Sequence, residues 1–87
     1  MDSEKRKLQL MTTDGCHLCE QALTLFDRSR LKQGFSLELV DIMDDNTLLE
    51  LYQTSIPVFV APASNASLGW PFSIVELDTF LSRIQSQ

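Results

Sequence analysis

The chain has 87 residues, of which 44% are hydrophobic and 22% are charged, and its formal net charge is −5. This size and composition predict one globular domain with a modest hydrophobic core. Twelve carboxylates outnumber seven lysines and arginines, and no basic residue lies between Lys32 and Arg83. Because phosphate backbones are bound mainly through basic side chains, the charge argues against a nucleic-acid partner.

The beginning of the chain and its apolar runs predict its organisation and location. We expect residues 1–6 to form a flexible N-terminal tail and residues 7–87 to form the domain. The first ten residues have no apolar stretch after their charges, which a secretory signal would need. The apolar runs are also shorter than the roughly 20 residues that cross a bilayer. We therefore expect a cytoplasmic protein without a membrane partner.

Hydrophobic periodicity predicts strands and helices in alternation. In chain order, the expected elements are a strand at 8–11, a helix from about 16 to about 33, a strand from 35 to 41 or 42, a helix after 44–47 that ends before 56, a strand at 58–61, a turn at 62–65, a short strand at 66–69 and a helix at 74–84. The order β-α-β-α-β-β-α indicates an α/β fold. Its first β-α-β unit should place two strands in parallel through a right-handed crossover.

The last helix has the clearest start signal. Ser73 and Glu76 fit a capping box, and Phe72 is placed to contact Leu77 as a hydrophobic staple. Apolar residues then recur at helical spacing as far as Ile84, so one face of this helix should be buried.

Both cysteines of the chain lie in the segment Cys16-His17-Leu18-Cys19, at the junction of the first strand and the first helix. Their i, i+3 spacing on a helix brings the two sulfurs within reach of a disulfide. A thiolate at a helix N-terminus is stabilised by unpaired backbone N–H groups and the helix dipole, which lowers the pKa of the thiol. Cys16 lies nearer that end, so we assign it as the nucleophile and Cys19 as the resolving thiol.

Two other interpretations of the cysteine pair stay open at this stage. Free cysteines are often small buried hydrophobic residues without reactivity. A Cys-x-x-Cys segment is also half of a zinc site, but a closed site needs four ligands and the chain has no second cysteine pair. A Cys-x-x-Cys pair beside a β-α-β pattern is the usual context of redox chemistry. We therefore favour the redox interpretation and assign no metal ligand.

Two neighbouring residues are expected to modulate the pair in opposite directions. Protonated His17 would stabilise the Cys16 thiolate and make the disulfide more oxidising, unless its side chain simply faces solvent. Asp14 lies two residues before Cys16, and its carboxylate would raise the pKa of the thiol unless it points away.

Three segments, in this order, resemble the glutaredoxin branch of the thioredoxin superfamily, and more closely the short bacterial glutaredoxin-like domain proteins. They are Cys16-His17-Leu18-Cys19 after the first strand, Ser55-Ile56-Pro57-Val58 before the third strand, and Leu68-Gly69-Trp70-Pro71-Phe72 before the last helix. The resemblance covers most of the chain, from 8 to 84. It implies a thioredoxin-like fold, with a mixed four-stranded sheet and helices on both faces.

The resemblance also implies roles for residues away from the cysteines. Ile56 and Pro57 would line the edge that binds a substrate or thiol, with the Ile56–Pro57 bond in cis and facing the disulfide. Trp70 would belong to the same binding region. We expect the bonds before Pro62 and Pro71 to be trans, as most X-Pro bonds are.

The chain departs from the typical glutaredoxin pattern where glutathione would be held. Typical members carry a basic residue just before the active-site motif and another near the second helix. Here Asp14 stands before the motif, and Asp44, Asp45 and Glu50 lie near the second helix. Because glutathione is an anion, we expect weak binding at most, and we assign no cofactor beyond glutathione as a weak reductant.

The sequence thus favours a thiol–disulfide oxidoreductase that acts on a disulfide-containing protein or a small thiol and requires a reducing partner. We expect a monomer. Two rival functions are an iron–sulfur or metal carrier that uses Cys16, and a non-catalytic interaction module with the thioredoxin fold. Visible absorbance of the purified protein would favour the first rival, and a lack of thiol redox activity would favour the second.

Overall fold

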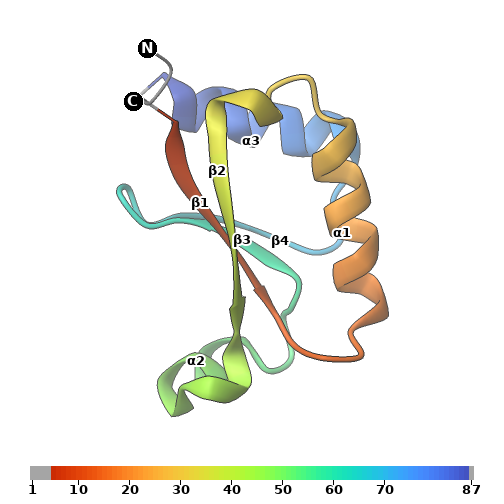
Figure 1. Cartoon of the computed structure of the whole chain (residues 1–87), viewed down its shortest axis with the longest axis vertical. Helices are drawn as coiled ribbons and strands as arrows, with labels where there is room; N and C mark the ends of the chain where they lie inside the picture. Colours follow the sequence, from red (N-terminus) through yellow and green to blue (C-terminus); the bar gives the residue numbers. More distant parts are fainter. Residues whose placement is uncertain (1–4, 87) are drawn as a thin grey trace.

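The computed structural model describes residues 5–86, and over this range it contains one four-stranded sheet and three α-helices (Figure 1). In chain order, the elements are β1 (Arg6–Thr12), α1 (His17–Arg28), β2 (Phe35–Asp41), α2 (Asn46–Tyr52), β3 (Val58–Ala61), β4 (Ala66–Gly69) and α3 (Ile74–Gln85). Short 3₁₀ turns precede β2 at Lys32–Gly34 and follow it at Ile42–Asp44. The predicted order β-α-β-α-β-β-α is confirmed.

The strand order in the sheet is β2-β1-β3-β4. β1 and β2 are parallel, as the β-α-β prediction requires, whereas β3 is antiparallel to β1 and β4 is antiparallel to β3. Met11 near the end of β1 pairs with Val58 at the start of β3. The loop that follows β1 and the loop that precedes β3 therefore lie at the same end of the sheet.

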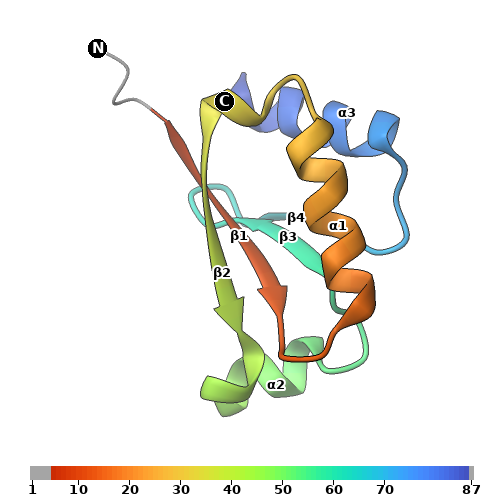
Figure 2. The ribbon, with the colours of Figure 1, turned by 45° about the vertical axis from the view of Figure 1, so that its right-hand side comes forward.

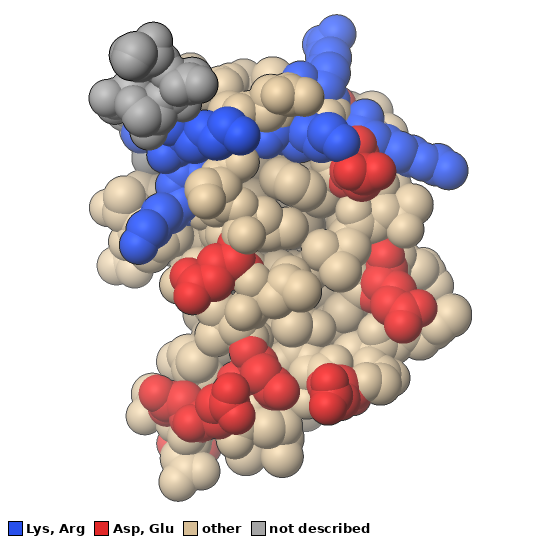
Figure 3. Space-filling view, in the orientation of Figure 1, with Lys and Arg blue, Asp and Glu red and all other residues tan. Residues whose placement is uncertain are grey.

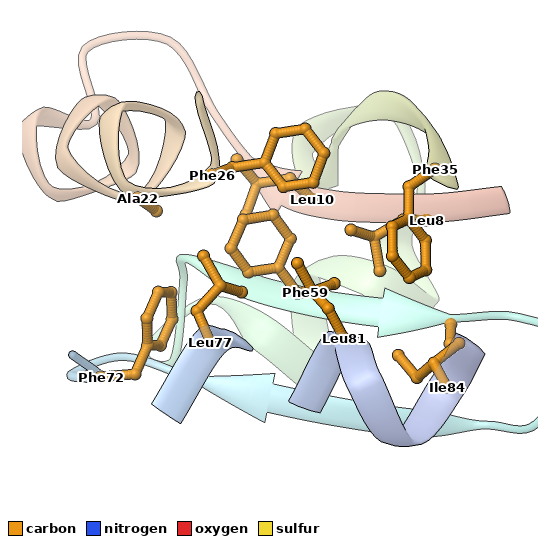
Figure 4. Packing of buried hydrophobic residues seen from close by; sticks show 11 residues of the cluster. Leu8, Leu10, Ala22, Phe26, Phe35, Phe59, Phe72, Leu77, Leu81 and Ile84 are labelled. Atoms are coloured by element: carbon orange, nitrogen blue, oxygen red, sulfur yellow. The ribbon is translucent and has the colours of Figure 1, made fainter. Parts of the chain in front are cut away.

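One face of the sheet is covered by α1 and α3 and holds the main core (Figures 1 and 2). Phe59 of β3 lies near the centre of this core, with the rings of Phe26 and Phe72 at centroid distances of 5.9 and 5.6 Å (Figure 4). Leu77 and Leu81 of α3 are fully buried against the same group. The predicted buried stripe of the last helix is confirmed, as is its Ser73–Glu76 capping box.

The opposite face of the sheet is covered by α2 only near the end of β1 (Figure 1). Met11, Ile42 and Val58 form a small second core there. The apolar side of α2, which includes Leu48 and Tyr52, packs on it. Helices therefore lie on both faces, as expected, and α2 is placed at the same end of the sheet as the start of α1.

The first helix is shorter than its sequence pattern predicts, because it ends at Arg28 and not near residue 33. Ser29 terminates it with an extended backbone and is 3% exposed. Its hydroxyl donates to Asp78 Oδ1 at 2.6 Å and accepts from the Leu31 N–H at 3.1 Å. The bond to Leu31 is local, but the bond to Asp78 joins residues 49 positions apart, which hydrophobic periodicity cannot detect.

Arg6, the last residue of the predicted tail, is the first residue of β1 and pairs with Phe35. Its guanidinium donates to the Gln85 carbonyl at 3.2 Å, so Arg6 belongs to the domain and not to the predicted tail. The rest of the tail prediction, at residues 1–4, lies outside the described residues.

Of the three backbone isomers predicted before prolines, two are correct and one is wrong. The Ile56–Pro57 bond is cis, as the resemblance implies, and the bond before Pro62 is trans as expected. The Trp70–Pro71 bond is also cis, so the expectation of trans there is wrong. The trans preference before proline is only about 0.5–1 kcal/mol, so tertiary contacts can reverse it. Trp70 makes such contacts: its N–H donates to the Pro57 carbonyl at 3.1 Å, and its ring meets that of Phe72 edge-on at 5.0 Å.

Candidate functional site

Cys16 and Cys19 are joined by a disulfide at the start of α1, with their Cα atoms 5.2 Å apart. Cys16 is the N-cap residue of the helix, and its Sγ accepts a hydrogen bond from the Cys19 N–H at 3.1 Å. The i, i+3 spacing therefore bridges as predicted, and Cys16 Sγ occupies the position that a capping oxygen usually takes.

The two sulfur-bearing side chains differ in accessibility. Cys19 is 2% exposed and packs inside the domain, whereas Cys16 is partly exposed. Cys16 is therefore the more accessible of the two residues. The predicted assignment of Cys16 as the attacking sulfur and Cys19 as the resolving sulfur fits this arrangement.

The loop that presents Cys16 is set by Gly15 and Thr13. Gly15 has a φ of +75°, a left-handed conformation that residues with a Cβ adopt at a cost. The Cys16 N–H donates to the Thr13 carbonyl at 3.3 Å, which closes a turn between β1 and α1. The backbone reversal at Gly15 lets the chain leave the sheet and enter the helix with Cys16 at the junction.

A hollow of about 350 Å³ lies beside the disulfide, between the start of α1 and the ends of β1 and β2. Besides both cysteines, its lining includes Asp14, Glu20, Leu39 and Asp41. No lysine or arginine of residues 5–86 lines it, so its charged groups are all carboxylates. We refer to this space as the hollow.

Sequence reasoning identified Asp14 but missed the other side chains of the hollow. Glu20 lies four residues after Cys16 and could have been found from helical spacing. Leu39 and Asp41 come from β2, and only the parallel register of β1 and β2 brings them to the same end of the sheet. Asp41 also accepts a hydrogen bond from the Met43 N–H at 2.9 Å, which fixes the turn after β2.

His17 faces solvent and does not cover the disulfide. Its side chain is 82% exposed, and its Nδ1 lies 3.9 Å from Glu20 Oε1. This is the solvent-facing alternative that the sequence left open. A carboxylate thus lies beside the imidazole on the same helical turn.

Pro57 and Trp70 lie at the same end of the sheet as the cysteines. Pro57 directly precedes Val58, which pairs with Met11 near the end of β1, and the Pro57 carbonyl accepts the Trp70 N–H. The Ile56 N–H donates to the Tyr52 carbonyl at 3.1 Å, so this donor is already used within the chain. Trp70 is only partly exposed and packs against the main core.

Comparison with known proteins identifies the family. A family model described as "Glutaredoxin-like domain (DUF836)" matches residues 7–82. The chain belongs to this glutaredoxin-like family. No curated protein sequence matches the chain at a significant level.

Solved structures show the same fold in relatives of this glutaredoxin-like domain. An X-ray structure of the structural-genomics target protein XcR50 from X. campestris is 32% identical, with a TM-score of 0.75, and the match covers 87% of this chain and 96% of that one. Protein Ne2328 from Nitrosomonas europaea is 28% identical, with a TM-score of 0.67, over 88% and 92% of the two chains. Thioredoxin 1 from Thermosipho africanus is 15% identical, with a TM-score of 0.66, over 92% and 94%. The last likeness shows that the fold is thioredoxin-like.

The glutaredoxin-like domain separates its charges between its two ends (Figure 3). All seven lysines and arginines lie at the start of β1, after the middle of α1 or near the end of α3: they are Lys5, Arg6, Lys7, Arg28, Arg30, Lys32 and Arg83. These segments are at the end of the molecule opposite the disulfide. Carboxylates dominate the disulfide end, where the hollow and α2 lie. Asp45 is one of the acidic residues near the second helix, where typical glutaredoxins carry a basic residue. Its side chain also caps α2 by accepting hydrogen bonds from the Thr47 and Leu48 N–H groups.

Two further features of the glutaredoxin-like domain concern metal-ligating clusters and membrane-spanning helices. Among residues 5–86, no group of three or more histidine, cysteine, aspartate or glutamate side chains is arranged to hold a metal ion. No helix in the described part of the chain is long and apolar enough to span a membrane.

Proposed function

We propose that this glutaredoxin-like domain is a thiol–disulfide oxidoreductase that reduces or exchanges disulfides through Cys16 and Cys19. The observation that carries the proposal is the bridged pair at the start of α1, with one partly exposed sulfur and one buried sulfur. A helix N-terminus favours a thiolate at Cys16, because the Cys19 N–H already points at its sulfur. The family and the thioredoxin-like fold support the same chemistry.

The reaction transfers two electrons from the reduced pair to a substrate. The Cys16 thiolate attacks one sulfur of the substrate disulfide, so a Cys16–substrate S–S bond forms and the substrate S–S bond breaks. The departing substrate sulfur leaves as a thiolate and takes up a proton. Cys19 then loses its proton and attacks the Cys16 sulfur, which releases the second substrate thiol and leaves the Cys16–Cys19 disulfide.

A dithiol reductant returns the pair to the reduced form by the same exchange in reverse. In this proposal the domain works in the cytoplasm, where thiols are kept reduced and a dithiol protein can supply the electrons. Glutathione is at best a weak reductant, because no lysine or arginine of residues 5–86 lines the hollow to bind its carboxylates.

Ile56, Pro57 and Trp70 are proposed to form the edge on which a substrate segment lies. Support comes from their position at the end of the sheet that carries the disulfide. Pro57 itself is fully buried, and its carbonyl already accepts the Trp70 N–H. The Ile56 N–H is used by the Tyr52 carbonyl, so the partly exposed side chains of Ile56 and Trp70 are what this edge offers a substrate.

The test is a trapping experiment with matched cysteine variants. The reduced wild-type protein should titrate with two thiols, lose both to mild oxidant without forming dimers, and reduce a disulfide-bonded peptide stoichiometrically. Cys19→Ser should accumulate a mixed disulfide with the peptide. Cys16→Ser should neither reduce the peptide nor form a mixed disulfide with it. Full peptide reduction by Cys16→Ser, or two thiols that persist in oxidised wild type, would contradict the proposed function.

A further inference from the structure

The disulfide end of the molecule combines a reactive sulfur with a consistent negative charge. Asp14, Glu20 and Asp41 line the hollow beside Cys16, and no described lysine or arginine lines it. The basic residues are gathered at the opposite end of the domain (Figure 3). A partner that reaches Cys16 therefore meets a hollow whose charged groups are all negative, while the positive charges lie at the opposite end of the domain.

The same end also carries exposed apolar surface. Large hydrophobic side chains that are exposed there are Leu18 in the first turn of α1, Leu39 beside the hollow, Met43 after β2 and Leu51 of α2, with exposed fractions of 42%, 55%, 62% and 62%. These side chains come from α1, β2, the turn after β2 and α2. Exposed aliphatic groups among polar ones are typical of protein contact sites, so an extended protein segment finds apolar groups to contact at this end.

We infer that the partners of this domain are disulfide-bearing protein segments in which Lys or Arg flanks the reacting cysteine; the inference rests on the proposed redox function. A cationic side chain beside the partner's cysteine would enter the hollow and face the Asp14, Glu20 and Asp41 carboxylates. Acidic flanking residues would be repelled by the same groups. The selection acts on the approach of the partner to Cys16 and leaves the exchange chemistry itself unchanged.

Competing peptide substrates test this inference directly. Two synthetic peptides would share one sequence with an internal disulfide and differ only in having Lys or Glu on both sides of the attacked cysteine. Rates of reduction by the reduced wild-type protein would be divided by the rate for 2,2′-dithiodipyridine, a neutral disulfide that reports the intrinsic reactivity of Cys16. At about 10 mM salt, where charges act over about 30 Å, we expect the Lys peptide to react at least about tenfold faster than the Glu peptide. At about 1 M salt the ratio should fall toward one.

Charge-neutral variants locate the effect. Asp14→Asn with Glu20→Gln removes two charges from the hollow and should reduce the Lys-to-Glu ratio severalfold. Asp27→Asn with Glu38→Gln removes two charges from exposed positions away from the hollow and should leave the ratio near that of wild type. Both pairs change the net charge equally, so a difference between them reports the position of the charges.

The outcomes separate this inference from the function on which it rests. A ratio near one at low salt, with both peptides reduced, would overturn the charge selection and leave the oxidoreductase proposal in place. Equal effects of the two variant pairs would also overturn it, because net charge alone would then explain the rates. Failure to reduce either peptide, by a protein with two titratable thiols, would overturn the redox function and the inference together.

Discussion

Cys16 and Cys19 are chemically identical residues whose surroundings make them different. Cys16 caps α1, receives the Cys19 N–H on its sulfur and is partly exposed, whereas Cys19 is 2% exposed. We therefore expect that, in the reduced protein, the helix N-terminus makes Cys16 the more reactive sulfur and burial makes Cys19 the less reactive one.

Iodoacetamide should therefore modify Cys16 well before Cys19 when the reduced protein is treated near neutral pH. Mass mapping of the alkylated peptides after short reaction times measures the order. The Cys19→Ser variant serves as the control, because its single thiol should react at the rate of wild-type Cys16. Faster modification of Cys19 in the wild type would reverse the roles assigned to the two sulfurs.

Substitution of Gly15 should lower the stability of the domain because of its left-handed backbone conformation, and not because a side chain would lack room. A Cβ added at Gly15 would meet no atom within 4 Å, yet φ is +75°. Gly15→Ala should lower the free energy of unfolding by about 1–2 kcal/mol, the cost of a left-handed backbone in a residue with a Cβ. Gln21→Ala, at an exposed position of α1, should change it by less than about 0.5 kcal/mol. Urea unfolding of the oxidised proteins checks both values, and an unchanged stability in Gly15→Ala would show that the loop relaxes.

At the scale of elements, α1 and α3 are connected by a polar contact as well as by their shared core. The hydroxyl of Ser29, just after α1, donates to Asp78 of α3 and also accepts the Leu31 N–H. One buried side chain thus satisfies two partners on different segments and determines where α1 ends.

Ser29→Ala should destabilise the domain by about 1–3 kcal/mol, because Asp78 loses its partner and the Leu31 N–H loses its acceptor. Ser82→Ala, exposed on α3, is the matched control and should have little effect. Equilibrium unfolding measures the difference. Equal stabilities of the two variants would mean that water replaces the Ser29 hydroxyl without cost.

The ion pair between Asp27 near the end of α1 and Lys32 in the following turn should be detectable in the pH titration of the Asp27 carboxyl. Lys32 Nζ lies 2.7 Å from Asp27 Oδ1, and its hydrogen bond and charge lower the pKa of the Asp27 carboxyl. A lowered pKa in the folded state contributes stability above the ordinary carboxyl pKa, and that stability is lost as pH falls through the folded value. Lys32→Gln should therefore raise the pKa of Asp27, which carboxyl ¹³C shifts can follow. An unchanged titration of Asp27 would show that the pair is not formed in solution.

At the scale of the whole molecule, the separation of charge gives the domain an acidic reactive end and a basic opposite end (Figure 3). No lysine or arginine occurs from residue 33 to residue 82, the part of the chain that supplies α2, the Pro57 edge and the segment before α3. We therefore expect anionic reactants to be repelled from the disulfide end.

Glutathione should reduce the Cys16–Cys19 disulfide much more slowly than it reduces an ordinary glutaredoxin measured beside it. Each missing charge-assisted hydrogen bond costs about 1.5–3 kcal/mol, or roughly tenfold to a hundredfold in affinity. A dithiol reductant should work well, and the neutral monothiol 2-mercaptoethanol is the control for the effect of charge. Added salt should speed the glutathione reaction more than the control reaction. A glutathione rate equal to that of the ordinary glutaredoxin would contradict this prediction.

Several features of the fold could be predicted because they depend on neighbouring residues. The order of strands and helices follows hydrophobic periodicity, and the α3 start follows the short-range signal of Ser73 and Glu76. The disulfide follows from two cysteines one helical turn apart. The cis isomer before Pro57 was predicted from resemblance, since nothing local distinguishes it from Pro71.

The remaining features were decided by residues that are distant in sequence and adjacent in space. Asp78 accepts a hydrogen bond from the Ser29 hydroxyl at the point where α1 ends. The Trp70–Pro71 bond is cis, although most X-Pro bonds are trans, and Trp70 there contacts Phe72. The hollow exists only because the parallel register of β1 and β2 carries Leu39 and Asp41 to the start of α1. The sequence by itself therefore determined the elements and the reactive pair, whose signals are local. The tertiary structure decided what surrounds that pair, because charge and packing around Cys16 are sums over side chains from separate strands and helices.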